Sequence, residues 1–364
     1  MRSGYADLPL HWGSAPRWLF ARMVKLGRAI AEVIVAEYGA QEFLRRVSDP
    51  VWFQSLGCVL GFDWHSSGVT TTVCGALKQG VKGDEANLGL YVCGGKGAVS
   101  RRTPEEIRVF SDRFGLEADG LVRASRLSAK VDSSGLQDGY QVYQHVFFGT
   151  TDGSWAVVQQ GMNTETGWAR RYHWLSSGLS DFVVEPHAGI ASDHAGEVLN
   201  MVAREAEKCR RATVELAAER PERVCRELDR VKNLALPGHH PVLASDVSAR
   251  YFYKTLTSTY EQRPSGFAEL LLVPGVGPKT VRALALVADV VHGAKASFRD
   301  PATYSFAHGG KDGFPYPVNR ADYDRTTAVL EKGIRYAKMG LKEELDSLRR
   351  LERFYSSRNG RVRG

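Results

Sequence analysis

The chain has 364 residues, of which 43% are hydrophobic and 24% are charged. This length allows two domains, and the composition is that of an ordinary globular protein rather than of a disordered or fibrous one. No apolar run approaches the roughly 20 residues of a membrane span, and the N-terminus lacks the apolar segment of a signal peptide, so we expect a cytoplasmic protein. The formal net charge of +7 favours a polyanionic partner, although many basic proteins bind no nucleic acid.

In the first part of the chain, helical patterns come early. Apolar residues at helical spacing predict a helix over residues 29–39. Asp49 followed by Pro50 predicts the start of another helix, which continues through Val59. The sequence Thr103-Pro104-Glu105-Glu106 is typical of a further helix start with the threonine as N-cap.

Extended patterns lie between and after these helices. Residues 88–92 predict a short buried strand that ends in a turn at Gly94-Gly95. Residues 140–148 and 154–160 are rich in β-branched and aromatic side chains, and Thr151-Asp152-Gly153 between them suits a tight turn that needs positive φ. The first half of the chain is therefore predicted to be α+β.

The second half changes character. Residues 195–232 are charged and carry apolar side chains at helical spacing, which is typical of a structural helical hairpin. Gly, Ser and Pro residues within 178–192 suggest a domain boundary. We predict an α+β catalytic domain over 1–185, an all-helical domain over 186–354 and a basic disordered tail over 355–364.

One turn in the second half has the pattern of a phosphate-binding backbone. An apolar helical run ends at Pro274, and Gly275 and Gly277 have no side chain, so the backbone there can approach another molecule closely. A second helix is expected to begin near Pro278, a favoured first position. The unpaired N–H groups and the positive dipole end of that helix can hold a phosphate, and Lys279 adds charge.

The Pro-Gly-Val-Gly-x-Lys core of this segment resembles the helix–hairpin–helix family over about residues 267–290. The resemblance implies binding of a DNA backbone without sequence readout, through the minor-groove side. The expected DNA contacts are Gly275, Val276, Gly277, Lys279, Thr280 and Arg282. The alternative is a helical hairpin used only for packing or for protein contacts.

Polar residues cluster in the first half of the chain at positions where a hydrophobic core would disfavour them. Asp63 and His65 stand between apolar residues, and residues 130–140 hold many hydrogen-bonding side chains just before a predicted strand. Carboxylates and imidazoles can hold Mg²⁺ or Mn²⁺ against a phosphodiester and activate water, and cationic side chains can neutralise the developing charge. We expect a metal-dependent nuclease with Asp63, Asp132 and Asp138 as metal ligands. The other expected catalytic residues are His65 and His145, as metal or acid–base residues, and Lys130 and Arg171, as phosphate contacts.

This nuclease hypothesis matches no named motif, and single residues have structural alternatives. Asp63, for example, could simply cap the helix predicted over 66–81. The chain also resembles, over nearly its full length, a family known as DUF763, which is found in archaea and bacteria. The matching segments are 6–11, 60–72, 130–145, 158–163 and 169–175. This resemblance implies a DNA nuclease activity located in these segments, with a role in DNA repair or processing.

Two alternatives to a nuclease remain open. Residues 273–283 resemble the DNA glycosylase/lyase superfamily, which implies Lys279 as an amine nucleophile and Asp300 as the downstream acid. Against this, the iron–sulfur cysteines of part of that superfamily are missing, and the context Phe298-Arg299-Asp300-Pro301 departs from its pattern. The other alternative is a DNA-binding or scaffold protein without catalysis, whose apolar N-terminal helices support a homodimer.

Overall fold

The computed structural model describes residues 17–61, 68–192, 196, 198–232, 249–302, 328–335 and 347–351. These residues combine helices with a five-stranded antiparallel sheet in the order β1-β3-β4-β5-β6, so the predicted α+β class is confirmed. The strands are β1 (Leu90–Lys96), β3 (Gln141–Thr150), β4 (Trp155–Met162), β5 (Ala169–Leu175) and β6 (Gly189–Ser192). A smaller sheet pairs β2 (Leu136–Gln137) with β7 (Leu199–Asn200).

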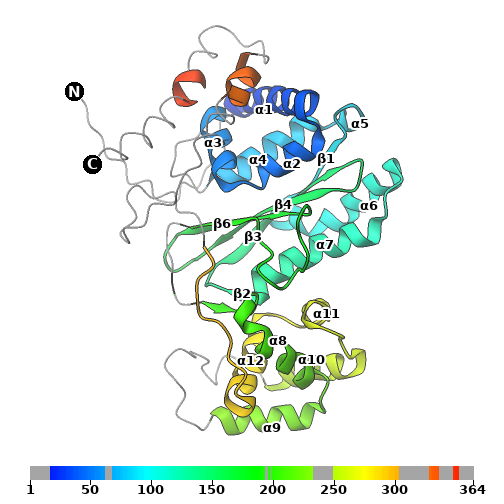
Figure 1. Ribbon diagram of the computed structural model, residues 1–364, viewed down its shortest axis with the longest axis vertical. Coiled ribbons are helices and arrows are strands. Elements are labelled where there is room, and N and C mark those ends of the chain that lie inside the picture. Colours follow the sequence, from blue (N-terminus) through cyan, green and yellow to red (C-terminus); the bar gives the residue numbers. More distant parts are fainter. Residues whose placement is uncertain are drawn as a thin grey trace, which may run out of the picture.

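Four helices of the N-terminal part cover one face of the five-stranded sheet (Figure 1). They are α1 (Arg17–Tyr38), α2 (Ala40–Val47), α3 (Pro50–Leu60) and α4 (Gly68–Val81), and the short α5 (Glu85–Leu88) leads into β1. The side chains of Val146 and Val158 in the sheet share a core with Phe53 of α3 and Val73 of α4. This core also contains Leu330, so the described residues after 327 pack against the N-terminal helices and not with the helices that precede them in the chain.

The opposite face of the sheet is covered by α6 (Thr103–Phe114) and α7 (Ala118–Lys130). The short helical segments are η1 (Gly97–Arg102), η2 (Val131–Gly135), which follows α7 directly, and η3 (Arg204–Ala206). Five helices of the second half form the far end of the molecule (Figure 1). They are α8 (Glu207–Ala217), α9 (Pro221–Lys232), α10 (Ala249–Gln262), α11 (Phe267–Leu272) and α12 (Pro278–His292). Phe147 and Trp174 of the sheet share one continuous core with Leu271 and Leu284 of these helices.

The local predictions are partly confirmed. Helix α3 begins at Pro50, and the Asp49 carboxylate caps it by accepting hydrogen bonds from the backbone N–H groups of Val51 and Trp52. The predicted hairpin is present as β3 and β4, with Gly153 at φ 87° in its turn. None of the described helices is long and apolar enough to cross a membrane.

The predicted turn at Gly94-Gly95 is wrong, because strand β1 continues through both residues. A Cβ atom on Gly94 would collide with the backbone carbonyl of His145 on the neighbouring strand. Gly94 therefore permits a close approach of two strands, and Gly95 leaves room for the Val99 side chain of η1. Thr103 is likewise the first residue of α6 and not its N-cap. The Glu106 carboxylate accepts hydrogen bonds from Gly94 N and from the Lys78 ammonium instead of closing a capping box.

Candidate functional site

Strand β5 divides its polar side chains between the two faces of the sheet. Arg170, Tyr172 and Trp174 point toward residues 132–138, which follow α7, whereas Arg171 and His173 point toward α2 and α3. The first face is covered by residues 130–138, which run from the last residue of α7 through η2 and β2 and are called here the junction segment. This segment contains three of the predicted catalytic residues.

Asp132 lies at the centre of a buried polar network on this face and is itself fully buried. One carboxylate oxygen accepts hydrogen bonds from the Trp174 indole, at 2.9 Å, and from the Gln159 amide. The other accepts from Nε2 of His187 at 2.5 Å. A buried carboxylate with three donors is well compensated for the loss of water.

The network continues from Gln159 to His145 and Ser125. Because the Gln159 amide nitrogen donates to Asp132, its oxygen accepts from Nδ1 of His145 at 2.8 Å. Nε2 of His145 then accepts from the Ser125 hydroxyl at 2.8 Å. Burial lowers the pKa of His145, although the bond to Gln159 acts in the opposite direction. His145 is therefore a neutral member of a chain of donors directed toward the Asp132 carboxylate.

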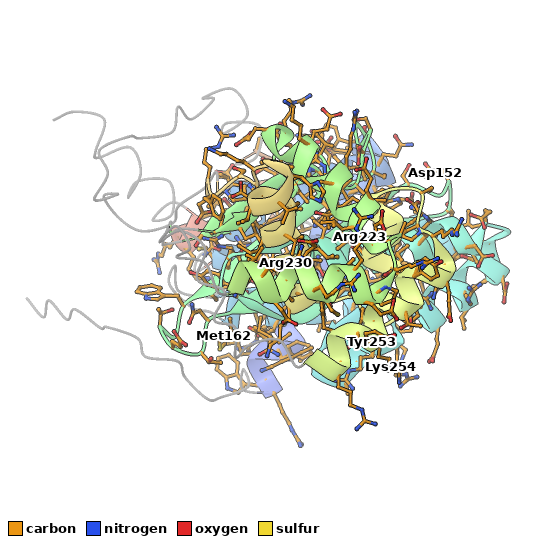
Figure 2. The ribbon with its side chains drawn as sticks, turned by 90° about the horizontal axis from the view of Figure 1, so that it is seen from below. Asp152, Met162, Arg223, Arg230, Tyr253 and Lys254 are labelled. Carbon is orange, nitrogen blue, oxygen red and sulfur yellow. The ribbon has the colours of Figure 1, made fainter. Side chains whose placement is uncertain are left out.

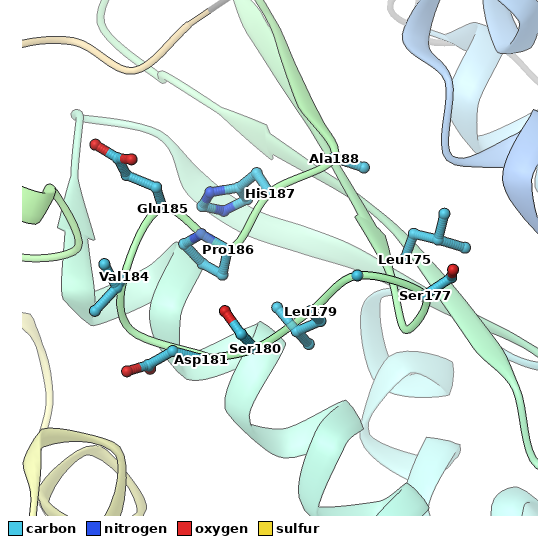
Figure 3. Close-up of a pocket in the computed structure, with 11 residues that line it drawn as sticks. Leu175, Ser177, Leu179, Ser180, Asp181, Val184, Glu185, Pro186, His187 and Ala188 are labelled. Carbon is cyan, nitrogen blue, oxygen red and sulfur yellow. The ribbon is translucent and has the colours of Figure 1, made fainter.

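The outer end of this network reaches a surface pocket on the loop between β5 and β6 (Figure 3). His187 lines the pocket together with Ser177, Asp181 and Glu185. Its ring packs edge-on against Trp174, with the ring centroids 4.6 Å apart. Nε2 of His187 is directed at Asp132, so Nδ1 is the ring nitrogen on the side away from this carboxylate, and the side chain is 6% exposed. Sequence reasoning missed His187, because nothing in its spacing connects it to Asp132.

Asp138 belongs to a second buried cluster on the same face. Its carboxylate accepts hydrogen bonds from Arg170, at 3.0 Å, and from the Tyr172 hydroxyl, at 2.7 Å. Arg170 is 1% exposed and also donates to Asp300 at 2.7 Å, and its guanidinium lies 4.6 Å from the centroid of the Tyr140 ring. Burial acts to lower the pKa of Arg170, but Asp138 and Asp300 outweigh it and raise that pKa. Asp300, the expected lyase acid, is thus held in a buried ion pair.

Arg171 lies on the other side of the sheet from Asp132, Asp138 and His145. Its guanidinium donates to the Gln54 amide oxygen at 3.2 Å and to Nε2 of His173 at 2.9 Å, and it lies over the Phe53 ring. The structure therefore does not bring Arg171 together with the other predicted catalytic residues. Asp63 and His65 lie outside the described residues.

Two of the three predicted metal ligands, Asp132 and Asp138, do not fit a divalent cation in the part of the chain that the structure describes. Asp132 and Asp138 already accept hydrogen bonds from nitrogen or hydroxyl donors at both of their oxygens. Among the described residues, no group of three or more His, Cys, Asp or Glu side chains could hold a metal ion. Mg²⁺ and Mn²⁺ need oxygen ligands that point at the ion rather than at N–H donors.

The turn between α11 and α12, residues 273–277, is held from two sides. The Lys130 ammonium donates to the carbonyl of Val276 at 2.6 Å. The Tyr251 hydroxyl of α10 donates to the carbonyl of Gly275 at 3.2 Å, and Gly275 has φ 91°. Burial lowers the pKa of Lys130. This lysine, predicted to contact phosphate, is instead a support of the turn.

The start of α12 is tied to the junction segment by Gln137. The Gln137 amide donates to the carbonyl of Pro278 at 2.9 Å, and Nε of Arg282 donates to the Gln137 amide oxygen at 2.9 Å. The side chains of Val276 and Thr280 are buried, so only their backbone is available to a ligand. Of the residues predicted to contact DNA, Gly275 and Lys279 are exposed, and Gly277 and Arg282 are half-buried.

The described residues leave the N-terminal end of α12 uncovered. Gly277 is its N-cap, with φ −141°, and a Cβ atom added there would meet nothing within 4 Å. No described side chain accepts a hydrogen bond from the N–H groups of Gly277, Lys279 or Thr280. Such groups carry the positive end of the helix dipole. The junction segment thus connects two features, the Asp132 network and this open helix end.

The chain matches the family described as "Protein of unknown function (DUF763)" over residues 4–318. The α+β protein with this buried polar network and open helix end therefore belongs to the DUF763 family. No curated protein and no solved structure matches it.

Proposed function

We propose that this protein binds the phosphodiester backbone of DNA without reading its sequence, with α11, the 273–277 turn and α12 acting as a helix–hairpin–helix motif. The observation that carries the proposal is the open N-terminal end of α12. Its N–H groups, which have no side-chain acceptor among the described residues, would form an anion site for a backbone phosphate together with the exposed Lys279 ammonium and an N-cap residue without a side chain.

The rigidity of the turn supports binding over a role in packing alone. Val276 is anchored in the core and its carbonyl is held by Lys130, whereas Pro274, Gly275 and Lys279 are exposed. A hairpin used only for packing has no need of an exposed edge of glycine backbone beside a cation. The net charge of +7 adds the long-range attraction that brings a polyanion to such a site.

The sharpest test uses Gly277, because the two glycines of the turn are not equivalent. Gly275 has positive φ, and its added Cβ would lie 3.1 Å from Thr255, so any substitution there strains the fold. Gly277 has an extended backbone and open space around it. The variant Gly277→Val should therefore fold normally yet keep a phosphate away from the α12 N–H groups.

We expect Gly277→Val to weaken binding of a duplex by on the order of tenfold or more in fluorescence anisotropy, since it removes charge-assisted hydrogen bonds. The matched control is Gly196→Val, at an exposed glycine whose added Cβ also meets nothing within 4 Å. Thermal unfolding of both variants checks that each is folded. Unchanged affinity in a folded Gly277→Val protein would contradict the proposal.

One observation favours a second candidate function, hydrolysis of the bound strand. The Asp132–His187 pair includes an imidazole in the lining of the loop pocket, although the His187 side chain is only 6% exposed, and the junction segment connects this pair to the 273–277 turn. An imidazole fixed by a carboxylate is a competent general base. The nuclease predicted from the sequence would then use His187, which that prediction did not include.

End-labelled single-stranded, duplex and flap DNA, incubated in Mg²⁺ or Mn²⁺ and in EDTA, test this second candidate. Strand cleavage that is lost in His187→Gln, with DNA affinity unchanged, is the expected result. His292→Gln is the control, because His292 is an exposed histidine at the end of α12. Intact strands under every condition would leave a DNA-binding protein without nuclease activity.

A further inference from the structure

Helix α10 places an exposed aromatic ring at the edge of the 273–277 turn. Tyr251, in its first turn, is 57% exposed, whereas the next residue, Phe252, is 2% exposed and belongs to the core. The Tyr251 hydroxyl donates to the carbonyl of Gly275 at 3.2 Å. One end of the ring is therefore fixed to the turn, while much of the ring itself remains open to solvent.

Tyr251 has cationic neighbours among the described residues of its own helix. Arg250 and Lys254 are exposed on the same helix, and no acidic residue lies in the first turn of α10. Tyr251 and Lys254 are three residues apart, so their side chains lie on the same side of the helix. Lys279 stands two residues after Gly277 on the other side of the turn and is also exposed. An exposed aromatic ring with cations beside it suits a partner that carries both a negative charge and a planar ring, as a nucleotide does.

A second exposed tyrosine on α10 has different surroundings. Tyr253 is 42% exposed, but its hydroxyl donates to the Glu222 carboxylate of α9. Figure 2, which views the molecule from the end formed by α9 and α10, labels Tyr253 beside Lys254 on α10 and Arg223 and Arg230 on α9. A carboxylate in contact with the hydroxyl makes the Tyr253 ring a poor place for a phosphate chain. The two tyrosines therefore form a natural test pair.

We propose that the Tyr251 ring is a stacking platform for an unpaired base, and that the protein prefers DNA containing a base that is not paired to DNA that is fully duplex. This inference rests on the proposed binding of a DNA backbone at the start of α12. A nucleotide joins its phosphate to its base through a single sugar. A phosphate on the N–H groups of α12 would thus place its own or a neighbouring base near the ring that Tyr251 attaches to the same turn.

Base pairing decides which substrates can use the platform. Within a duplex, both faces of a base are covered by its neighbours in the stack, so its face cannot reach a protein ring unless the base leaves the helix. A bulge, a gap or a flap presents a base without that cost. Stacking on an aromatic side chain tolerates any base, because each has a π face, so the preference would be for DNA structure and not for sequence.

The experiment compares two DNAs that differ by a single unpaired base. One is a fluorescein-labelled duplex, and the other is the same duplex with a one-nucleotide bulge of 2-aminopurine. Anisotropy gives the affinity of each, and the fluorescence of 2-aminopurine reports whether the base becomes stacked. We expect the wild-type protein to bind the bulged DNA on the order of tenfold more tightly than the duplex and to quench the 2-aminopurine.

The variants separate stacking from other roles of Tyr251. Tyr251→Leu and Tyr251→Phe both lose the hydrogen bond to the Gly275 carbonyl, so any weakening of duplex binding should be the same in both, whereas Tyr251→Leu should also lose the preference and the quenching. Tyr251→Phe should keep most of the preference, and Tyr253→Leu should keep all of it. Equal affinity of the wild type for both DNAs, or a preference that survives in Tyr251→Leu, would overturn the stacking platform and leave backbone binding intact. A wild-type protein that binds neither DNA would overturn the proposed function as well.

Discussion

The ammonium group of Lys130, the last residue of α7, donates a hydrogen bond to the carbonyl of Val276 in the 273–277 turn. The same chain segment continues two residues later to Asp132, whose carboxylate is bound to His187 beside the loop pocket. A short stretch of chain therefore fixes the open end of α12 relative to the buried network on the sheet. The sequence had suggested phosphate binding for Lys130, but the structure directs its charge to the backbone of the turn.

A salt titration of DNA binding distinguishes these two roles. Each phosphate contact by a lysine steepens the dependence of log K on log salt by about 0.9. Lys279→Met should therefore reduce that slope by about one and leave the stability unchanged, because Lys279 is exposed. Lys130→Met should leave the slope unchanged but lower the free energy of unfolding by about 1–3 kcal/mol, since it leaves a carbonyl without its partner. A reduced slope in Lys130→Met would restore Lys130 as a phosphate contact.

The buried ion pairs of Arg170 predict that replacing this residue causes a large loss of stability. Arg170→Met leaves the carboxylates of Asp138 and Asp300 without their cation in a buried site, at a cost of about 3–5 kcal/mol in the free energy of unfolding. Urea denaturation measures this loss. Arg211→Met serves as the control, because the Arg211–Glu207 pair is exposed on α8 and contributes little. Similar urea midpoints for the two variants would show that the Arg170 ion pairs contribute little to the free energy of unfolding.

The buried histidines predict that the protein loses stability in mild acid. Burial lowers the pKa of His145 and of His173 below the ordinary value of about 6.5, so both are neutral when folded. Below that value, the unfolded chain binds protons that the folded chain does not. The free energy of unfolding should then fall by up to about 1.4 kcal/mol per pH unit for each histidine.

Urea denaturation at pH 7.5 and at pH 5.5 measures this effect. Replacing His145 with Gln, which can still accept a hydrogen bond from Ser125, should reduce the difference between the two pH values even if the variant is less stable overall. A difference that is the same in the wild type and in His145→Gln would show that His145 does not carry the acid sensitivity.

Much of the local structure could be predicted from the sequence, because it depends on contacts between neighbours in the chain. Asp49-Pro50 gave the start of α3, and Asp152-Gly153 gave the hairpin turn. The density of polar side chains in residues 130–140 likewise identified the junction segment. The pair Gly94-Gly95 led to the wrong prediction of a turn, because glycine also occurs where two strands approach closely. Only the tertiary structure decides whether a glycine forms a turn or permits a close approach.

The composition of the site could not be predicted in the same way, because it depends on strand register. Arg170 and Arg171 are adjacent in the chain, but the alternation of β5 sends one to Asp138 and the other to the opposite face of the sheet. The hydrogen bonds of Asp132 to Gln159 and His187 join segments that no spacing in the sequence relates. Which polar residues share a site is therefore a property of the fold.

The most direct test of the central claim is the affinity of the wild-type protein for two duplexes of equal length and unrelated sequence, measured over a series of salt concentrations. Backbone binding without sequence readout predicts the same affinity for both duplexes at each salt concentration, and an affinity that falls linearly on a log–log plot as salt rises. A protein that binds neither duplex at low salt would contradict the account, and so would one that prefers one sequence or is insensitive to salt.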